Sequence, residues 1–192
     1  MCETLKDHTK NQPVSLVIDY GTGTGRMIPD LIKTYPQAKV LGVDGSTKML
    51  AVAQTKYRSF DFIAANTGSL PIAPNAADIV TACMASSYTN EPEGLLASMA
   101  GSLKVGGLLG LIDSRLPKLQ VVQKASLAAN AVYGDTPESV SALTKVYTHI
   151  IANQGIEVKS IGGEAMKLRL VKPTGPSAEN WGFFGCVLQR VN

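Results

Sequence analysis

Short apolar runs alternate along this chain with segments in which apolar residues recur at helical spacing. The runs at residues 14–19, 38–44, 60–65, 78–84 and 108–113 have the length and composition of buried strands. The segments of helical character between them are residues 26–35, 46–57 and 92–103. Strand and helix therefore alternate, and this order predicts an α/β fold with a parallel sheet.

The last third of the chain has a less regular pattern. Apolar spacing predicts helices over residues 118–133 and 138–153, and apolar runs predict strands at 156–161 and 183–189. Between those strands, residues 165–171 alternate Met and Leu with Lys and Arg. The alternation predicts either a strand with one solvent-exposed face or a β extension of the sheet.

The bulk properties bound the class of protein. A chain of 192 residues is long enough to bury one core, so we expect a short lead-in at 1–13 and a single domain at 14–192. A net charge of +3 without a basic cluster does not favour nucleic acid or an anionic membrane as a partner. No apolar run reaches the ~18 residues that span a bilayer, and the polar first residues lack the apolar core of a signal peptide.

The cysteines give a further bound. The chain has three, Cys2, Cys83 and Cys186, and no C-x-x-C pair. This number and spacing predict neither a disulfide framework nor a zinc site. We therefore expect reduced thiols and a cytoplasmic protein.

The stretch from Val17 to Arg26 carries the most chemistry. An acid, Asp19, follows a buried strand, and three glycines then come at alternate positions. Glycine permits a sharp turn and lets a ligand lie against bare backbone. A dinucleotide fingerprint would need glycine at position 26, which is Arg26, and the Lys-Ser/Thr of a P-loop is missing. Asp19 would repel a pyrophosphate but suits a cationic ligand, although a purely structural turn is an alternative interpretation.

A second acid ends the next predicted strand. Asp44 comes 19 residues after Gly25, and one strand-helix-strand unit brings it beside the glycine turn. A carboxylate in this place can accept both hydroxyls of a ribose. Alternatively, Asp44 or Ser46 only caps the helix that follows.

The glycine stretch resembles motif I of the class I S-adenosylmethionine (SAM)-dependent methyltransferases, in which two apolar residues and an acid precede three alternating glycines. Later segments resemble the same family in the same order. They are residues 43–50, similar to V-D-x-S-x-x-M-L, the pair Leu70-Pro71, and residues 103–109, similar to L-K-P-G-G-x-L with Val105 at the proline. The resemblance covers about residues 14–113 and is closest to the UbiE or methyltransferase 11 subgroup, which acts on small molecules.

The resemblance implies a Rossmann-like three-layer sandwich with a seven-stranded, mostly parallel sheet whose last strand is antiparallel. It implies SAM as cofactor, whose ammonium and sulfonium suit an acid in the loop. Asn66 stands where the family usually has an acid on the adenine amino group, and an amide can accept a hydrogen bond without bringing charge. The implied cofactor-binding residues are Asp19, Tyr20, Gly21, Thr22, Gly23, Gly25, Asp44, Gly45, Met49, Asn66, Thr67 and Met84.

The implied reaction is SN2 transfer of a methyl group to an O, N or C atom of a small molecule. Because the sulfonium is already activated, positioning can supply most of the rate. The Asn/Asp-Pro-Pro-Tyr/Phe of enzymes that methylate adenine or glutamine nitrogens is missing after residues 78–84, which argues against a nucleic-acid base as substrate. Asp113 has no evident acidic partner, so we expect no metal site.

Three side chains are candidates for the acceptor end: Tyr88, Asp113 and His149. Tyr88 could orient an acceptor or be an ordinary loop aromatic. Asp113 could bind an acceptor amine or hydroxyl, or cap the next turn. His149 could act as a general base, or be a surface or satisfied core histidine.

Few residues precede the first predicted strand, where many small-molecule methyltransferases carry a helical cap. We therefore expect an open site, or one covered by a second copy of the chain or by a partner chain. The alternative function is a SAM-binding accessory or sensor protein without transferase activity, and a nicotinamide oxidoreductase is a further one.

Overall fold

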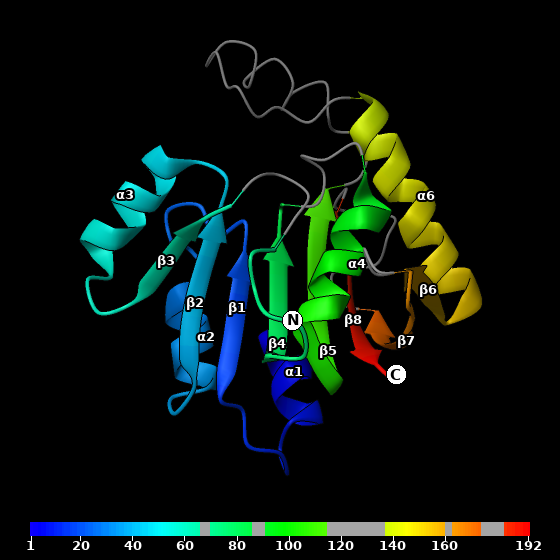
Figure 1. Cartoon of the computed structure of the whole chain (residues 1–192), viewed down its shortest axis with the longest axis horizontal. Helices are drawn as coiled ribbons and strands as arrows, with labels where there is room; N and C mark the ends of the chain where they lie inside the picture. The colour runs from blue at the N-terminus through cyan, green and yellow to red at the C-terminus, as the bar shows by residue number, and fades with distance from the viewer. Residues whose placement is uncertain (66–69, 86–90, 115–136, 160–162, 174–182) are drawn as a thin grey trace.

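The computed structural model describes residues 1–65, 70–85, 91–114, 137–159, 163–173 and 183–192. Over these residues the chain forms a sheet with helices on both faces (Figure 1). The strands are β1 (Leu16–Tyr20), β2 (Lys39–Asp44), β3 (Asp61–Ala64), β4 (Ala77–Cys83), β5 (Leu103–Ser114), β6 (Gly155–Lys159), β7 (Ala165–Pro173) and β8 (Phe183–Arg190). The helices are α1 (Cys2–His8), α2 (Ile28–Thr34), α3 (Thr47–Lys56), α4 (Pro92–Ser102) and α6 (Pro137–Asn153).

The strand order in the sheet is β3-β2-β1-β4-β5-β8-β7-β6. Strands β1 to β5 pair in parallel. Strand β8 pairs antiparallel with both β5 and β7, and β6 pairs antiparallel with β7. The carboxyl ends of β1 to β5 therefore meet at one edge of the sheet, which we call the carboxyl edge. Ligands of open α/β sheets bind outside this edge. The opposite edge is the amino edge.

The predicted α/β sandwich is confirmed, but the described sheet has eight strands rather than seven. The alternating segment at 165–171 lies within β7, a full strand between β8 and β6. Its apolar side chains Met166 and Leu168 are buried in the core, and Lys167 and Arg169 are exposed. Two strands, β6 as well as β8, therefore run against the first five, because each of the last three neighbour pairs is antiparallel.

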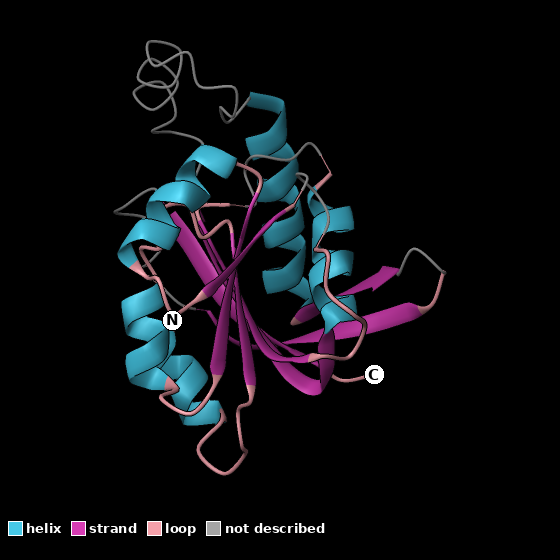
Figure 2. Ribbon diagram, turned by 60° about the vertical axis from the view of Figure 1, so that its left-hand side comes forward, coloured by secondary structure: helices cyan, strands magenta, loops and turns pink. Residues whose placement is uncertain are grey.

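Each face of the sheet carries its own apolar core, so that helices and sheet form three layers (Figure 2). On one face, Leu5 of α1 and Leu31 of α2 pack with Val17 of β1. On the other face, Met99 of α4 and Ile150 of α6 pack with Ile18 of β1. Neighbouring residues of β1 thus point into different cores, as the pleat of a strand requires.

The predicted lead-in at residues 1–13 contains helix α1, which packs against α2. Its Leu5 is fully buried, so this segment contributes to the core of one face. Within the described residues, no helix has both the length and the apolar character needed to cross a membrane.

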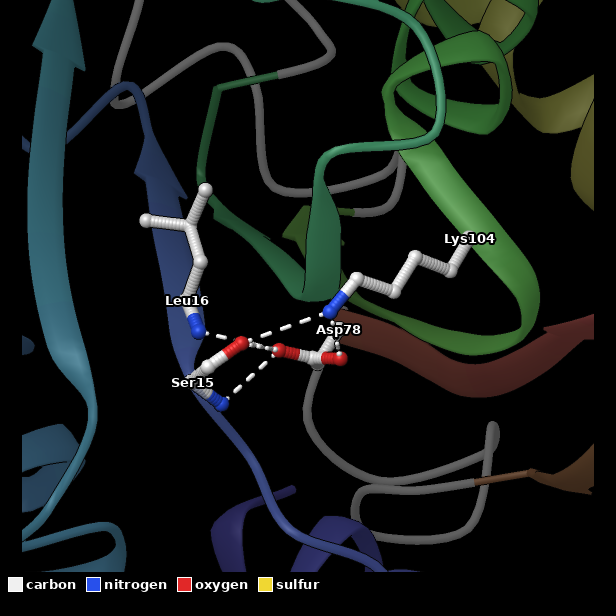
Figure 3. A network of polar contacts seen from close by, with 4 residues as sticks. All are labelled: Ser15, Leu16, Asp78 and Lys104. Atoms are coloured by element: carbon white, nitrogen blue, oxygen red, sulfur yellow. Dashed lines mark hydrogen bonds and ion pairs between the residues drawn. The ribbon is translucent and has the colours of Figure 1, made fainter.

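A polar network fastens the amino edge (Figure 3). The Oδ2 atom of Asp78 in β4 accepts from the backbone N–H of Ser15 at 2.8 Å, the Ser15 hydroxyl at 2.7 Å and the N–H of Leu16 at 2.9 Å. Its Oδ1 atom accepts from Lys104 Nζ of β5 at 2.6 Å. We call these four residues the amino-edge clamp, because they join the starts of β1, β4 and β5.

Candidate cofactor site

The glycine loop follows β1 at the carboxyl edge. Gly21, Gly23 and Gly25 all have left-handed backbone, with φ of +69°, +56° and +80°. The N–H groups of Gly21 and Thr22 donate to Val43 O of β2 at 2.7 and 3.0 Å. A Cβ atom added to Gly21 would lie 2.2 Å from Cβ of Ala85, in the turn after β4. The loop is therefore closely packed between the ends of β2 and β4, and any side chain at Gly21 would be strained.

Asp44 ties the glycine loop to the start of α3. Its Oδ2 atom accepts from Gly23 N–H at 2.8 Å, and its Oδ1 atom accepts from Ser46 N–H at 2.8 Å. The N-cap of α3 is Ser46, whose hydroxyl accepts from Met49 N–H at 3.3 Å. Each carboxylate oxygen can accept a second hydrogen bond. The half-buried Asp44 therefore keeps acceptor capacity for a ligand.

Asp19 is buried beside the loop, with 1% of its surface exposed. Its Oδ1 atom accepts from the Thr81 hydroxyl of β4 at 2.8 Å. Asp19 Oδ2 and Thr22 Oγ1 are both buried and find no hydrogen-bond partner among the described residues. Buried polar atoms without partners are rare, because the lost hydration is not replaced. The two atoms therefore mark a place where a polar ligand group would be stabilised.

The environment of Asp19 opposes its charge. Burial, with a smaller contribution from the nearby charge of Asp44, raises the pKa of the carboxyl to about 6. The hydroxyls of Thr22 and Thr81 act in the other direction. The Thr22 hydroxyl favours the ionised form, although neither its Oγ1 nor Asp19 Oδ2 makes a hydrogen bond among the described residues. A cation placed against Oδ2 would remove most of this cost.

The other predicted cofactor residues lie around the same loop or outside the described residues. Met49, which is 48% exposed, has its sulfur 3.6 Å from where a Cβ of Gly23 would lie. Met84 has φ of +58° and donates its N–H to Ile112 O at 2.7 Å. Gly45 is exposed directly after Asp44, and Tyr20 is buried in the core on the α4 face. Asn66 and Thr67 lie outside the described residues.

The residues predicted for the acceptor do not lie together in the structure. Asp113 is buried near the carboxyl end of β5, two strands from β1. His149 is exposed on α6, where its Nδ1 atom lies 3.3 Å from the Asn153 amide nitrogen of the same helix. Helix α6 packs against α4, β6 and β7, at the far end of the sheet order from β2. The structure therefore does not bring His149 to the glycine loop, and Tyr88 lies outside the described residues.

Thr81 is a site residue that the sequence interpretation did not select. It faces Asp19 because the parallel register pairs residue 19 with residue 81. The available signal was a single hydroxyl within the apolar run of β4. That signal became informative only once the neighbouring strand was known.

A separate hollow lies beside the edge strand β3. It has a volume of about 460 Å³ and is lined by Lys39, Leu41, Gln54 and residues 58–63. None of the glycine-loop residues line it. Among the described residues, no three His, Cys, Asp or Glu side chains gather as a metal site requires.

The fold and the loop define a class of protein. A left-handed glycine turn follows β1, with a buried acid beside it and a second acid at the end of β2. These are the features expected of a Rossmann-like site for a nucleoside ligand that carries positive charge. Residues 18–111, about half of the chain, match the family described as a methyltransferase domain. The chain belongs to the class I SAM-dependent methyltransferases of the UbiE-like type, and its cofactor is SAM.

Two curated relatives show the extent of the similarity. The chain is 34% identical over 95 residues to trans-aconitate 2-methyltransferase of Rhodopseudomonas palustris, covering 50% of this chain and 37% of the relative. It is 30% identical over 111 residues to demethylmenaquinone methyltransferase of Chlorobaculum parvum, covering 58% of this chain and 46% of the relative. The chain therefore spans less than half the length of either relative.

Nearly the whole chain shares its fold with one chain of a solved complex. This is the complex between the Trm112 methyltransferase activator of Haloferax volcanii and a methyltransferase, with a TM-score of 0.66 at 19% identity. The match covers 98% of this chain and 89% of that one. At this identity the likeness concerns the fold.

The residues present fit SAM. The loop exposes backbone rather than side chains, and Asp44 keeps acceptor capacity beside it. Asp19 offers a buried oxygen without a partner among the described residues, which suits the ammonium of the cofactor.

Proposed function

We propose that this chain transfers a methyl group from SAM to a small-molecule acceptor. The observation that carries the proposal is the unpartnered, buried oxygen of Asp19 at the end of β1. An acid here supports a positively charged cofactor. It disfavours a nicotinamide dinucleotide, because a buried carboxylate repels a pyrophosphate.

In this proposal the chain's own residues bind and orient the cofactor. Asp19 receives the ammonium, and Asp44 accepts from the ribose hydroxyls with the lone pairs not used by Gly23 and Ser46. Met49 lies beside Gly23 of the loop, and Met84 directly precedes Ala85, which packs against Gly21. Asn66 and Thr67 are assigned to the adenine from the sequence alone. When bound, SAM supplies a methyl group already activated by its sulfonium.

We infer a small-molecule acceptor from the names of the two relatives. One is named for trans-aconitate and the other for demethylmenaquinone, and these are different kinds of small molecule. Asp113 supports an acceptor site beside the cofactor, because it is buried near the carboxyl end of β5. Tyr88 is assigned to the acceptor from the sequence alone, and His149 is left out.

Calorimetric titration with S-adenosylhomocysteine tests the cofactor. We expect binding at a single site, and no heat of binding from NADH under the same conditions. An Asp44→Ala variant should bind S-adenosylhomocysteine more weakly by ~1–3 kcal/mol, through the lost hydrogen bonds. Binding of NADH instead of S-adenosylhomocysteine would contradict the proposal.

Methyl transfer from labelled SAM into a metabolite extract tests the activity. We expect label in a small molecule, and less label with an Asp113→Asn variant whose affinity for S-adenosylhomocysteine is unchanged. If Asp113→Asn lowers cofactor affinity and labelling together, Asp113 does not act on the acceptor alone.

A SAM-binding accessory protein is the second candidate. The observation behind it is that a chain of this fold is found in a solved complex with a methyltransferase activator, so a chain of this fold can work together with a partner protein. In that case label would enter the extract only after a partner protein is added. Labelling by the purified chain alone would exclude this candidate.

A further inference from the structure

Thr81 has a buried hydroxyl that packing within the sheet does not require. Its side chain is fully buried in β4, where the apolar residues Ile79, Val80 and Ala82 surround it in sequence. A β-branched apolar residue of the same shape would fill the position without a polar group to satisfy. The hydroxyl therefore has its effect through the group that it contacts.

That group is Asp19. The Thr81 hydroxyl lies 2.8 Å from Asp19 Oδ1 and 3.4 Å from Ile18 O. A hydroxyl has one proton to donate, and the shorter contact to a carboxylate is the stronger. The parallel register holds the two residues side by side on neighbouring strands. Thr81 therefore fixes one oxygen of Asp19 within the sheet.

The remaining oxygen is left for a ligand. Asp19 Oδ2 has no hydrogen-bond partner among the described residues, and neither has the buried hydroxyl of Thr22 in the glycine loop. Rotation of the carboxyl would only exchange its two oxygens. One oxygen would still accept from Thr81, and the other would still have no partner among the described residues.

Among the described residues, the charged and titratable groups around Asp19 give it no ion pair. Asp44 at the end of β2 repels its charge. Cys83 of β4 and Cys2 of α1 lie near enough for the charge of Asp19 to raise the pKa values of their thiols, which burial raises more. Arg26 acts on Cys83, and no ion pair of Asp19 occurs among the described residues. The hydroxyls of Thr22 and Thr81 are therefore the groups that favour the ionised carboxyl.

We propose that Thr81 is a positioning residue that presents Asp19 to the ammonium of the cofactor and sets the pH above which the site accepts it. The inference rests on the proposed function. The cofactor binds to the ionised carboxyl, so at low pH its binding releases one proton from Asp19 to the solvent. Thr81 lowers the pH at which this proton leaves, because its hydrogen bond favours the charged form.

Calorimetric titration with S-adenosylhomocysteine between pH 5 and pH 7.5 tests the proposal. For the wild type we expect affinity to rise about tenfold per pH unit below pH 6 and to level above pH 7. Titration in buffers of different ionisation enthalpy should show release of about one proton at pH 5 and almost none at pH 7.5. An analogue of S-adenosylhomocysteine that lacks the amino group should bind with little dependence on pH.

Matched variants isolate Thr81. We expect Thr81→Val to move the rise in affinity up by about one pH unit, which makes binding about fivefold weaker at pH 6. Thr81→Ser, which keeps the hydroxyl, should restore the wild-type profile. The amino-free analogue should bind wild type and Thr81→Val equally, and circular dichroism checks that each variant is folded.

Several outcomes would overturn the proposal. An unchanged pH profile in Thr81→Val, or equal weakening of both ligands, would reduce Thr81 to a packing role. If Thr81→Val does not fold, the wild type still decides the matter, because affinity without pH dependence or proton release would exclude titration of Asp19. No binding of S-adenosylhomocysteine to the folded wild type at any pH would instead overturn the proposed function itself.

Discussion

Asp19 and Asp78 lie on the neighbouring strands β1 and β4, at opposite edges of one sheet. At the amino edge, Asp78 accepts three hydrogen bonds on one oxygen and a lysine on the other. At the carboxyl edge, Asp19 accepts one hydrogen bond and keeps a buried oxygen without a partner among the described residues. The carboxylate of Asp78 is thus fully hydrogen-bonded by the protein itself, whereas that of Asp19 keeps an oxygen that a ligand could use.

The two pKa values express the same difference. Burial alone would raise the pKa of Asp78, but the hydrogen bonds from Lys104, Ser15 and Leu16 outweigh it and hold the pKa at about 2. Burial raises the pKa of Asp19 to about 6. The comparison teaches that a carboxylate which stabilises the fold and a carboxylate proposed to bind a ligand can be told apart by their hydrogen-bond partners.

The largest expected effect concerns the glycine loop. Gly21→Ala would place a Cβ atom 2.2 Å from Cβ of Ala85 at a backbone φ of +69°. We therefore expect the free energy of unfolding to fall by about 4 kcal/mol, and binding of S-adenosylhomocysteine to be lost. The matched control is Gly101→Ala in α4, where a Cβ meets nothing within 4 Å. That change should stabilise by about 0.5 kcal/mol. Chemical denaturation measures both, and equal effects would contradict the account of the loop.

A second prediction concerns Arg190, which also lies at the amino edge. Its Nη1 atom donates to Leu103 O at 2.6 Å, Ala100 O at 3.0 Å and Asn75 Oδ1 at 2.8 Å. Arg190→Met would remove a buried, charged donor from the carbonyl oxygens of Leu103 and Ala100, so we expect a loss of about 3 kcal/mol in the free energy of unfolding. Affinity for S-adenosylhomocysteine, measured well below the melting temperature, should not change.

The amino-edge clamp gives the third prediction. Asp78→Ala removes the acceptor for the N–H groups of Ser15 and Leu16, so we expect a loss of about 2 kcal/mol. Asp61→Ala, which breaks only the exposed ion pair with Lys39, should cost less than about 0.5 kcal/mol. The stability from Asp78 is present above pH 4 and is lost as pH falls from about 4 to about 2. If both variants lose a similar amount of unfolding free energy, the amino-edge clamp contributes no more to stability than an exposed ion pair.

Asp19 should show the opposite pH dependence in the ligand-free protein. Because its folded pKa of about 6 exceeds the unfolded value, its contribution to stability is full below pH 4 and is lost as pH rises to about 6. Asp19→Asn, whose amide can still accept from Thr81, should therefore be more stable than wild type by about 1–2 kcal/mol at pH 7. Thermal unfolding at pH 4 and pH 7 measures the difference, and a destabilised variant at pH 7 would count against an unpartnered carboxylate.

Local patterns predict the first five strands well, because each is a short apolar run between turn residues. The last three strands depend on pairings that such patterns do not contain, so β7 was predicted only as a strand or an extension. The end of α4 shows the same limit. Apolar spacing predicted a helix over residues 92–103 and a strand from residue 108, but α4 passes at Leu103 directly into β5. Arg190, 87 residues away, donates to the carbonyl oxygen of Leu103 at this junction.

The candidate site divides in the same way. Asp19, Asp44 and the three glycines are adjacent in one motif or one strand-helix-strand unit, so the sequence was enough to select them. The role of Thr81 depends on a neighbouring strand 62 residues further along the chain. His149 was selected for its chemistry alone, and α6 carries it to another part of the fold.

The most direct test of the contrast between the two edges is the affinity of two variants for S-adenosylhomocysteine at pH 7. Asp19→Asn and Asp78→Asn make the same chemical change on neighbouring strands. We predict that Asp19→Asn weakens binding at least tenfold while the protein stays folded, because the ammonium loses its carboxylate. Asp78→Asn should lower stability and leave the affinity unchanged. Equal affinities in the two variants, or weaker binding only in Asp78→Asn, would contradict the assignment of Asp19 to the cofactor.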